Sequence, residues 1–475
     1  MKRFIALLLA CVFVMSMTLT GCGKKTNDTK DGEASNPTKS AAGADTDNSA
    51  AAKVTDDPNV KTLNVWAFTD EVPKMLDKYK ELHPDFPYEI KTTVISTTEG
   101  AYQPALDQAL AAGGADAPDI FCAEAAFVLK YTQGDASQYA APYKDLGIDV
   151  DNLLKEADIA PYTVDIGTNT DGKLVGLGYQ ATGGAYIYRR SIAKDVWGTD
   201  DPATIKDKVG PGWDKFFQAA DELKAKGYGI VSSDGDIWHA VENSSEKGWV
   251  VDGKLHIDPK REEFLDFSKK LYDNDYSSKT IDFQDAAWFA DMKDGGKKKI
   301  FGFFGPAWLI NYVLAGNSGG KKIGEGTYGD WAACESPVGF FWGGTWVMGN
   351  KDTKLKKTVG DIINWITLDS SENGLQYLWA NGKLNDAGTK DAVASGTVMK
   401  KSDGKVDFLN GQNMFDVFVP AGKNATGKNK TQVDESINLI WRDQVRAYAA
   451  GKKTREKALA DFKQKVADKL DIPSE

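Results

Sequence analysis

The chain has 475 residues and a formal net charge of −10. This acidic balance argues against nucleic acid or an anionic lipid surface as a partner and favours solubility. The three histidines, His83, His239 and His256, share no metal-ligand spacing, so we expect no metal and no cofactor.

The first residues carry the pattern of a secretory signal. Lys2 and Arg3 precede an apolar run at residues 4–14, and residues 19–22 read Leu-Thr-Gly-Cys. A positive start, a short apolar core and small residues before a cut are typical of a signal peptide. The last four residues resemble a bacterial lipobox, which predicts that residues 1–21 are removed and that Cys22 is lipidated. The alternative is an ordinary signal peptide that happens to carry a Cys.

Residues 22–59 are predicted to form a disordered tether. The stretch is rich in Lys, Thr, Asp, Gly, Ser and Ala and has no aromatic residue. It therefore buries too little apolar surface to offset its chain entropy. Such a spacer lets a folded body stand off the membrane, and no later run approaches the roughly 20 apolar residues of a spanning helix.

The body from about residue 60 to residue 475 exceeds the roughly 250–300 residues at which single cores stop growing, so two domains are expected. Strands and helices alternate in its first part. Strands are predicted at 62–68, 88–95 and 118–122, and helices at 73–83 and 102–112. This order predicts an α/β fold with a parallel sheet and crossover helices.

The chain after Lys173 continues with mixed elements. Further strands are predicted at 186–189, 229–231, 299–304, 331–335 and 341–348. Helices are predicted at 213–226, 264–271, 359–368 and 372–379. Two long amphipathic helices end the chain, and the first has Ile437, Ile440 and Trp441 on its apolar face.

Two cysteines, Cys122 and Cys334, lie in the predicted folded body. They are compatible with one disulfide or with two buried free thiols. Stability therefore does not depend on a disulfide framework.

The order of several short motifs over about 400 residues is distinctive. They are Trp66 and Asp70 at the first strand, Ala-Pro-Asp-Ile at 117–120, the strand 186–189, Gly-Trp-Asp at 212–214, the run 301–308 ending Gly-Pro-Ala-Trp, residues 341–349 and Gly-Gln-Asn at 411–413. With the lipobox and spacer, this order resembles the extracellular solute-binding proteins of bacterial carbohydrate ABC importers, typified by maltose-binding protein. Trp308 comes one residue later than in the family's usual Gly-Pro-Trp, and Ala123 stands where maltose-binding protein has a stacking Trp. Both departures argue against maltodextrin as the ligand.

The resemblance implies a two-lobed periplasmic-binding-protein fold of the α/β class, with discontinuous lobes and a hinge. Lobe one would comprise residues 60–168 and 340–390, and lobe two residues 169–339 and 391–475. A sugar would be held between the lobes, and the hinge would close over it.

The chain has 13 Trp residues, and aromatic rings suit the C–H-rich faces of a pyranose. The candidates stand at predicted strand ends or in Gly-flanked loops, and they are Trp66, Trp238, Trp249, Trp308, Trp342 and Trp379. For each of them core packing is the alternative. The resemblance places Trp66 and Trp308 at the cleft.

Carboxylates suit the hydroxyl groups of a sugar because they accept short, strong hydrogen bonds. Asp70 and Glu71 follow the first strand at the end where ligands of open α/β sheets bind, and Glu124 follows the third strand. Capping of the next helix is the alternative for Asp70 and Glu71. Further candidates are Tyr179, Gln180, Gln412, Asn413 and Asp416, which could equally stabilise loops.

The sequence therefore predicts a lipid-anchored receptor on the outer face of the bacterial cell membrane, with no catalytic residue. It would capture a sugar or oligosaccharide, act as a monomer and present its ligand to ABC-transporter permease subunits. A secreted glycoside hydrolase is one alternative. A receptor for a peptide or another small solute is the other.

Overall fold

The computed structural model describes residues 54–97, 100–281, 285–385 and 387–474. The predicted signal peptide, Cys22 and most of the predicted tether lie outside these residues. The chain from Ala51 to Glu475 forms one compact unit. Within the described ranges, no helix has both the length and the apolar character needed to cross a bilayer.

A five-stranded sheet organises the first part of this unit. Its strands are β1 (Thr62–Ala67), β2 (Glu89–Val94), β3 (Ile120–Glu124), β10 (Thr345–Gly349) and β4 (Leu177–Gly178), in the order β2-β1-β3-β10-β4. The strands β1, β2 and β3 run parallel, and β10 runs antiparallel to both β3 and β4. The parallel arrangement predicted for the first three strands is therefore confirmed.

A second sheet has three strands, β8 (Gly302–Gly305), β5 (Ala185–Arg189) and β9 (Trp331–Glu335), with β5 in the middle and antiparallel to both neighbours. A hairpin of β6 (Val250–Val251) and β7 (Lys254–Leu255) lies apart. The strand predicted at 229–231 is absent as a strand. Gly229 and Val231 form single bridges to two different segments, at Ile300 and Ser277, so no continuous ladder develops.

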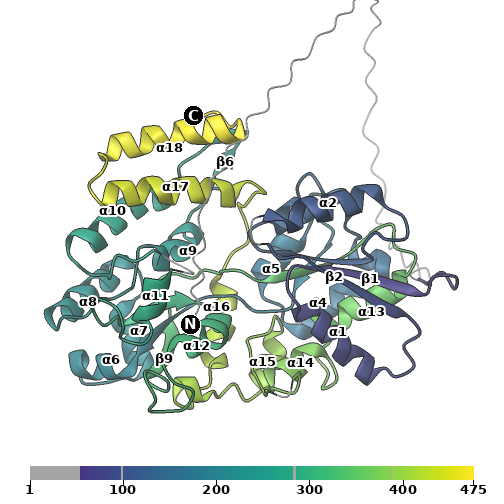
Figure 1. The fold of residues 1–475 in the computed structure, drawn as a ribbon, viewed down its shortest axis with the longest axis horizontal. Coiled ribbons are helices and arrows are strands. Elements are labelled where there is room, and N and C mark those ends of the chain that lie inside the picture. The colour runs from purple at the N-terminus through teal and green to yellow at the C-terminus, as the bar shows by residue number, and fades with distance from the viewer. Residues whose placement is uncertain (1–53, 98–99, 282–284, 386, 475) are drawn as a thin grey trace, which may run out of the picture. The chain divides into compact units, whose positions relative to one another are not determined.

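Helices surround the two sheets, as Figure 1 shows. Around the five-stranded sheet lie α1 (Glu71–Leu82), α2 (Tyr102–Ala112), α4 (Val150–Ala157) and α13 (Lys356–Thr367). Around the three-stranded sheet lie α6 (Arg190–Trp197), α7 (Pro202–Val209), α8 (Trp213–Ala225) and α10 (Pro259–Asp273). The other α-helices of the described residues are α3 (Val128–Thr132), α5 (Pro161–Gly167), α9 (Gly235–Asn243), α11 (Ala286–Asp291), α12 (Ala315–Asn317), α14 (Leu375–Ala380), α15 (Gly396–Lys401), α16 (Phe415–Asn424), α17 (Asp434–Ala449) and α18 (Arg455–Leu470).

The start of α1 shows how the chain sets an element beside the pocket. The helix begins at Glu71, two residues before the predicted start at Pro73. Proline is tolerated there because the first-turn N–H groups of a helix have no intrahelical partner. Val72, Met75 and Leu76 are buried, and Glu71, four residues before Met75, lies on the same side of the helix at its first turn.

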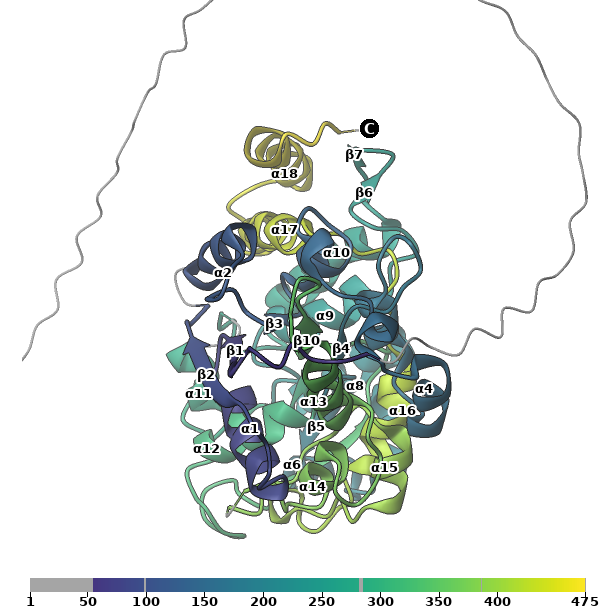
Figure 2. The ribbon, with the colours of Figure 1, turned by 90° about the vertical axis from the view of Figure 1, so that its right-hand side faces the viewer.

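The last residues of the described chain are hydrogen-bonded to strand β7. Figure 2 shows α17 and α18 one above the other, with the end of the described chain beside β7. The backbone N–H of Leu255 donates to the carbonyl oxygen of Pro473 at 2.8 Å. The buried face of α17 carries Ile437, Ile440 and Trp441, as predicted.

The structure differs from the predicted boundaries at residues 59 and 168. Residues 54–59 were assigned above to the tether, but the Asp56 carboxylate accepts hydrogen bonds from the backbone N–H groups of Lys357 and Thr358 at the start of α13. The strand β4 pairs with β10 of the five-stranded sheet, although residues 177–178 lie beyond the predicted lobe boundary at 168. The division into lobes otherwise stays a prediction.

Cys122 in β3 and Cys334 in β9 are buried free thiols. They lie in different sheets, and burial raises the pKa of both thiols. Of the two possibilities left open by the sequence, the structure selects the free thiols.

Candidate functional site

A pocket of about 890 Å³ lies where the chain passes between the two sheets. Residues 179–184 connect β4 to β5, and residues 336–344 connect β9 to β10. The pocket is lined by Thr69, Asp70, Glu71, Thr97, Glu124, Ala125, Ala126, Leu129, Gln180, His239, Glu242, Trp308, Tyr312, Val313, Phe341, Trp342, Gly343, Gly344, Lys430, Thr431, Asp434, Glu435, Asn438, Leu439, Arg442, Asp443 and Arg446. Both sheets therefore contribute, through the elements at their strand ends and through the connections.

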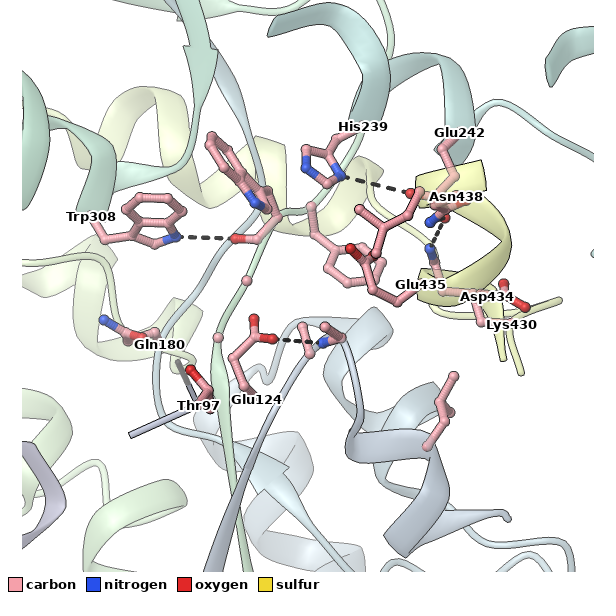
Figure 3. A pocket seen from close by; sticks show the side chains of 18 of the residues that line it. Thr97, Glu124, Gln180, His239, Glu242, Trp308, Lys430, Asp434, Glu435 and Asn438 are labelled. Carbon is pink, nitrogen blue, oxygen red and sulfur yellow. Dashed lines mark hydrogen bonds and ion pairs between the residues drawn. The ribbon is translucent and has the colours of Figure 1, made fainter. Parts of the chain in front are cut away.

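Three rings form a row along the pocket, and Figure 3 shows Trp308 and His239 above Glu124. The indole N–H of Trp308 donates to the backbone carbonyl oxygen of Trp342 at 3.0 Å. The two indole rings meet edge to face with centroids 4.8 Å apart. The imidazole of His239 stacks on Trp342 at 4.9 Å. Both Trp side chains are half-buried, so part of each ring surface is presented to a ligand.

Gly343 keeps the space between Trp308 and Glu124 open. Its φ of 70° lies in the left-handed region that favours glycine. A Cβ at this position would stand 3.4 Å from Trp308 Nε1 and 3.7 Å from Glu124 Oε1. The indole edge and the carboxylate therefore flank the same point, and any side chain at residue 343 would enter it.

Glu124 is the last residue of β3 and pairs with Thr345 of β10. Its Oε2 accepts a hydrogen bond from the backbone N–H of Ala126 at 2.8 Å. Burial raises the pKa of the Glu124 carboxyl to about 7, although this N–H and that of Ala125 lower it. The carboxyl group therefore titrates near neutral pH and either accepts or donates a hydrogen bond there.

Glu71 and Asp70 differ in their contacts. The two Glu71 carboxylate oxygens accept hydrogen bonds from the hydroxyl groups of Tyr179 and Tyr312. Burial raises the pKa of Glu71, and these two hydroxyls lower it. Asp70 stands at the N-cap position of α1 but makes no side-chain capping bond; its exposed carboxylate pairs instead with Lys74 at 2.6 Å.

A polar network lines the side of the pocket formed by α9 and the start of α17. Glu242 Oε1 accepts from Lys430 Nζ and from Asn438 Nδ2, each at 2.9 Å. His239 Nδ1 lies 3.7 Å from Glu242 Oε2. Burial raises the pKa of Glu242, but Lys430 and His239 outweigh it and hold that pKa well below its usual range. Burial lowers the pKa of His239, so the stacked ring is neutral at neutral pH.

Glu435, on the first turn of α17, faces the same pocket. Burial, and then the negative charges of Glu242 and Glu124, raise the pKa of its carboxyl to about 7. The pocket thus holds two carboxyl groups that titrate near pH 7, one beside Trp308 and one on α17.

The structure separates the ten predicted ligand-binding residues into two groups. Five line the pocket, namely Asp70, Glu71, Glu124, Trp308 and Trp342. The other five do not. Tyr179 is fully buried and reaches the pocket through its bond to Glu71, and half-buried Trp66 packs against the apolar cluster around Tyr102.

Trp238, Trp249 and Trp379 lie in the core. Trp238 packs on Phe264 and Trp379 on Tyr179, with ring centroids 4.9 Å and 5.5 Å apart. Trp249 packs edge to face on Trp441 and at a tilt against Phe462, and its indole N–H donates to Asn438 Oδ1 at 2.7 Å. The structure thus shows core packing, the alternative stated for each of them. The prediction failed for these three residues because a glycine near a Trp does not determine which way the ring points.

The further candidates other than Tyr179, namely Gln180, Gln412, Asn413 and Asp416, also divide. Gln180 lines the pocket. The Gln412 Oε1 atom accepts a hydrogen bond from the backbone N–H of Ala333 at 2.9 Å, and Gln412 Nε2 donates one to the carbonyl oxygen of Ala333 at 2.8 Å. Asn413 donates to Asp416 at 3.1 Å. The last three residues thus stabilise loops, which was the second interpretation of each.

Sequence reasoning missed the contribution of α17. Glu435, Leu439, Arg442 and Arg446 line the pocket and follow one another at spacings of four, three and four residues. This spacing puts them on one helical stripe, away from the apolar stripe of Ile437 and Trp441. A polar stripe on an amphipathic helix equally describes a solvent-facing surface, so only the fold reveals its role. The sequence also missed Tyr312, on the π-helical turn Leu309–Leu314 that follows Trp308, and the pocket residues His239 and Glu242 of α9.

In the portions of the chain that the structure describes, no group of three or more His, Cys, Asp or Glu residues is placed to hold a metal ion. The carboxyl groups of Glu71, Glu124 and Glu242 accept hydrogen bonds from neighbouring side chains and a backbone N–H group, and the rings of Trp308 and Trp342 form another wall. This arrangement suits an uncharged ligand with apolar faces and many hydroxyl groups.

Comparison with known proteins identifies the family and the fold. The profile of the family described as bacterial extracellular solute-binding protein matches residues 74–403. No curated protein matches the chain. Similar solved structures include the sugar-binding protein MalE of Xanthomonas citri, with a TM-score of 0.65 and 15% identity over 86% of this chain and 97% of that one.

Two further similar structures come from bifidobacteria. The galacto-N-biose/lacto-N-biose I-binding protein of Bifidobacterium longum, in complex with lacto-N-biose, has a TM-score of 0.62 and 16% identity over 88% of this chain and 100% of that one. The ABC-transporter binding protein of B. animalis subsp. lactis, in complex with beta-1,6-galactobiose, has a TM-score of 0.57 and 19% identity over 86% and 97%. These likenesses confirm the predicted fold class, a two-lobed α/β binding-protein fold.

Proposed function

Because the chain belongs to the bacterial extracellular solute-binding protein family, we propose that it captures a sugar or oligosaccharide outside the cell and presents it intact to an ABC-transporter permease. Members of this family bind solutes rather than convert them, so no bond is made or broken. The proposal rests on one observation: the Trp308 indole and the Glu124 carboxyl group flank the space that a side chain at residue 343 would fill.

A pyranose ring matches this arrangement in two ways. Its C–H-rich face packs on the exposed parts of Trp308 and Trp342, and its hydroxyl groups bond to Glu124 at the edge. The carboxyl group of Glu435 and the amide of Gln180 supply further partners along the pocket. A pocket of about 890 Å³ lies at the upper end of the range for small-ligand sites, which favours an oligosaccharide over a single sugar. The sugars bound by the two bifidobacterial proteins support the same ligand class.

Closure of the two lobes over the sugar is the proposed mechanism. The connections at residues 179–184 and 336–344 pass beside the pocket, so rotation about them would bring the ends of β1 and β3 towards α17 and the turn after β8. Binding energy then comes from contacts made by both sides at once, and the closed form is the one recognised by the permease.

A calorimetric titration of the unit Ala51–Glu475 against neutral oligosaccharides and a set of short peptides tests the ligand class. We expect saturable binding of at least one oligosaccharide and no heat with the peptides. Binding of peptides alone would retain the fold and overturn the proposed ligand.

The membrane attachment is a separate part of the proposal. We infer from the Leu-Thr-Gly-Cys pattern that Cys22 carries the lipid that holds the protein on the outer face of the membrane. Metabolic labelling with a radioactive fatty acid should mark the full chain and not the C22A variant, which we expect in the medium. Labelling of C22A to the same extent would contradict the lipid site.

A further inference from the structure

Tyr312 is exposed at the pocket although it belongs to a buried turn. Its four apolar neighbours on the π-helical turn, Leu309, Ile310, Val313 and Leu314, are buried, whereas Tyr312 itself is 55% exposed. A hydrogen bond to a distant segment of the chain anchors this turn, because Asn311 Nδ2 donates to the carbonyl oxygen of Lys390 at 2.7 Å. The backbone beside Tyr312 is thus anchored, while more than half of the surface of Tyr312 is exposed to solvent.

The Tyr312 hydroxyl bonds across the pocket to Glu71. Tyr312 follows β8 of the three-stranded sheet, and Glu71 follows β1 of the five-stranded sheet. The hydroxyl oxygen lies 3.4 Å from Glu71 Oε1, longer than the 2.5–3.0 Å typical of an O–H···O bond. The contact is therefore weak, and within the described residues Glu71 is the hydroxyl's hydrogen-bond partner.

The second oxygen of Glu71 is held differently. Tyr179, whose ring is fully buried against Trp379, donates its hydroxyl to Oε2. The carbonyl oxygen of Tyr179 accepts from Gln376 Nε2 at 3.0 Å, so its position is fixed by the core. One oxygen of Glu71 thus has a rigid donor, and the other has a weak, exposed donor on the ligand side.

We propose that Tyr312 is a movable contact residue that controls affinity: a sugar hydroxyl takes Glu71 Oε1 from the Tyr312 hydroxyl, and the released ring packs on the sugar. This inference rests on the proposed function. A ligand hydroxyl at ordinary bonding distance makes a better bond to Oε1 than the 3.4 Å contact does. The ring then adds apolar area next to Trp308, which precedes it by four residues.

The proposal predicts different effects for two substitutions of Tyr312. Y312F keeps the ring and removes the competing hydroxyl, so the best sugar of the panel should bind about 2- to 10-fold more tightly than to the wild type. Y312A also removes the ring and should bind about 5-fold or more weakly than Y312F. Calorimetric dissociation constants and melting temperatures of each variant are the measurements.

Two controls separate this role from a structural one. Tyr272 is 37% exposed and does not line this pocket, so Y272F and Y272A should leave the dissociation constant unchanged. In an E71A background the gain from Y312F should disappear, because the substitution removes the oxygen for which the Tyr312 hydroxyl competes. Y312F binding equal to or weaker than wild type, or a gain that persists in E71A, would overturn the inference. Wild-type protein that binds none of the sugars would contradict the proposed function itself.

Discussion

The indole N–H of Trp308 donates to the backbone carbonyl oxygen of Trp342 at 3.0 Å, and this bond fixes the edge-to-face contact of the two rings. One ring comes from the turn after β8 and the other from the connection between β9 and β10. The aromatic surface of the pocket is therefore built at the place where the chain passes between the sheets, where a change in their relative position alters it directly.

The Trp308–Trp342 contact predicts a graded loss of affinity. W308A removes the ring and its apolar area, so sugar affinity should fall by about 30- to 100-fold. W308F keeps a ring but loses the N–H donor, and its affinity should fall by about 3- to 10-fold. Calorimetry measures both values. W213F, in α8 and outside the pocket, is the matched control and should bind normally. Unchanged affinity in W308A would remove Trp308 from the site.

G343A fills the point between Trp308 and Glu124. The added Cβ would stand 3.4 Å from Trp308 Nε1, so we expect at least about a 10-fold loss of sugar affinity. The positive φ also costs about 1–2 kcal/mol of stability. G198A is the matched control, since its φ is 74° and nothing lies within 4 Å of its Cβ. It should lose similar stability and retain affinity, and equal affinity of both variants would contradict the assignment of the point to the ligand.

Glu124 predicts a pH dependence of binding. Sugar hydroxyls donate best to the ionised carboxylate, and the pKa of Glu124 is raised to about 7 by burial. As the pH falls from about 8 to about 6 the carboxylate becomes protonated, so affinity should fall by up to about 10-fold. E124Q should lose that part of the pH dependence. Burial and nearby negative charges also raise the pKa of Glu435 to about 7, so E435Q should likewise lose part of the pH dependence of affinity.

The same raised pKa predicts a change in stability with the opposite pH direction. An acid whose folded pKa exceeds its unfolded value contributes stability that is full below the unfolded pKa and is lost as pH rises through the folded pKa. For Glu124 this window runs from about 4.5 to about 7. E124Q should therefore be more stable than wild type at about pH 8, on the order of 2 kcal/mol, and differ less at about pH 5. Urea unfolding of both proteins measures the difference, and a pH-independent difference would contradict it.

Trp238 lies in the core, which predicts that its loss affects folding and not binding. It packs on Phe264 and is 1% exposed. W238F should lower the free energy of unfolding by about 1–3 kcal/mol, because a cavity remains beside Phe264. The dissociation constant of the folded protein should stay within about twofold of wild type. A large loss of affinity at unchanged stability would place this ring at the ligand.

Much of the fold could be predicted because its elements carry strong periodic patterns. Helix α2 and strand β9 have the predicted bounds, and the predicted apolar face of α17 with Ile437, Ile440 and Trp441 is buried. The segment 229–231 was assigned wrongly because an apolar stretch shows that a chain is buried and not which neighbours it pairs with.

The site was harder to predict, for a reason that Glu124 and Trp249 illustrate. Glu124 ends a strand, and the direction of parallel strands brings such ends to a common edge. Trp249 lies in a loop near glycine, but its ring packs on Trp441 and Phe462, which follow it by 192 and 213 residues in the chain. The stripe of Glu435 and Arg442 on α17 is likewise defined by tertiary packing alone.

The central claim is capture of a sugar without conversion. Its most direct test is a tryptophan-fluorescence titration of the unit Ala51–Glu475 with the best oligosaccharide of the panel, followed by chromatography of the ligand released on denaturation. The account predicts a saturable change at one sugar per chain and recovery of the sugar with its length and linkage unchanged. Recovery of shorter products, formed in proportion to protein and time, would contradict it.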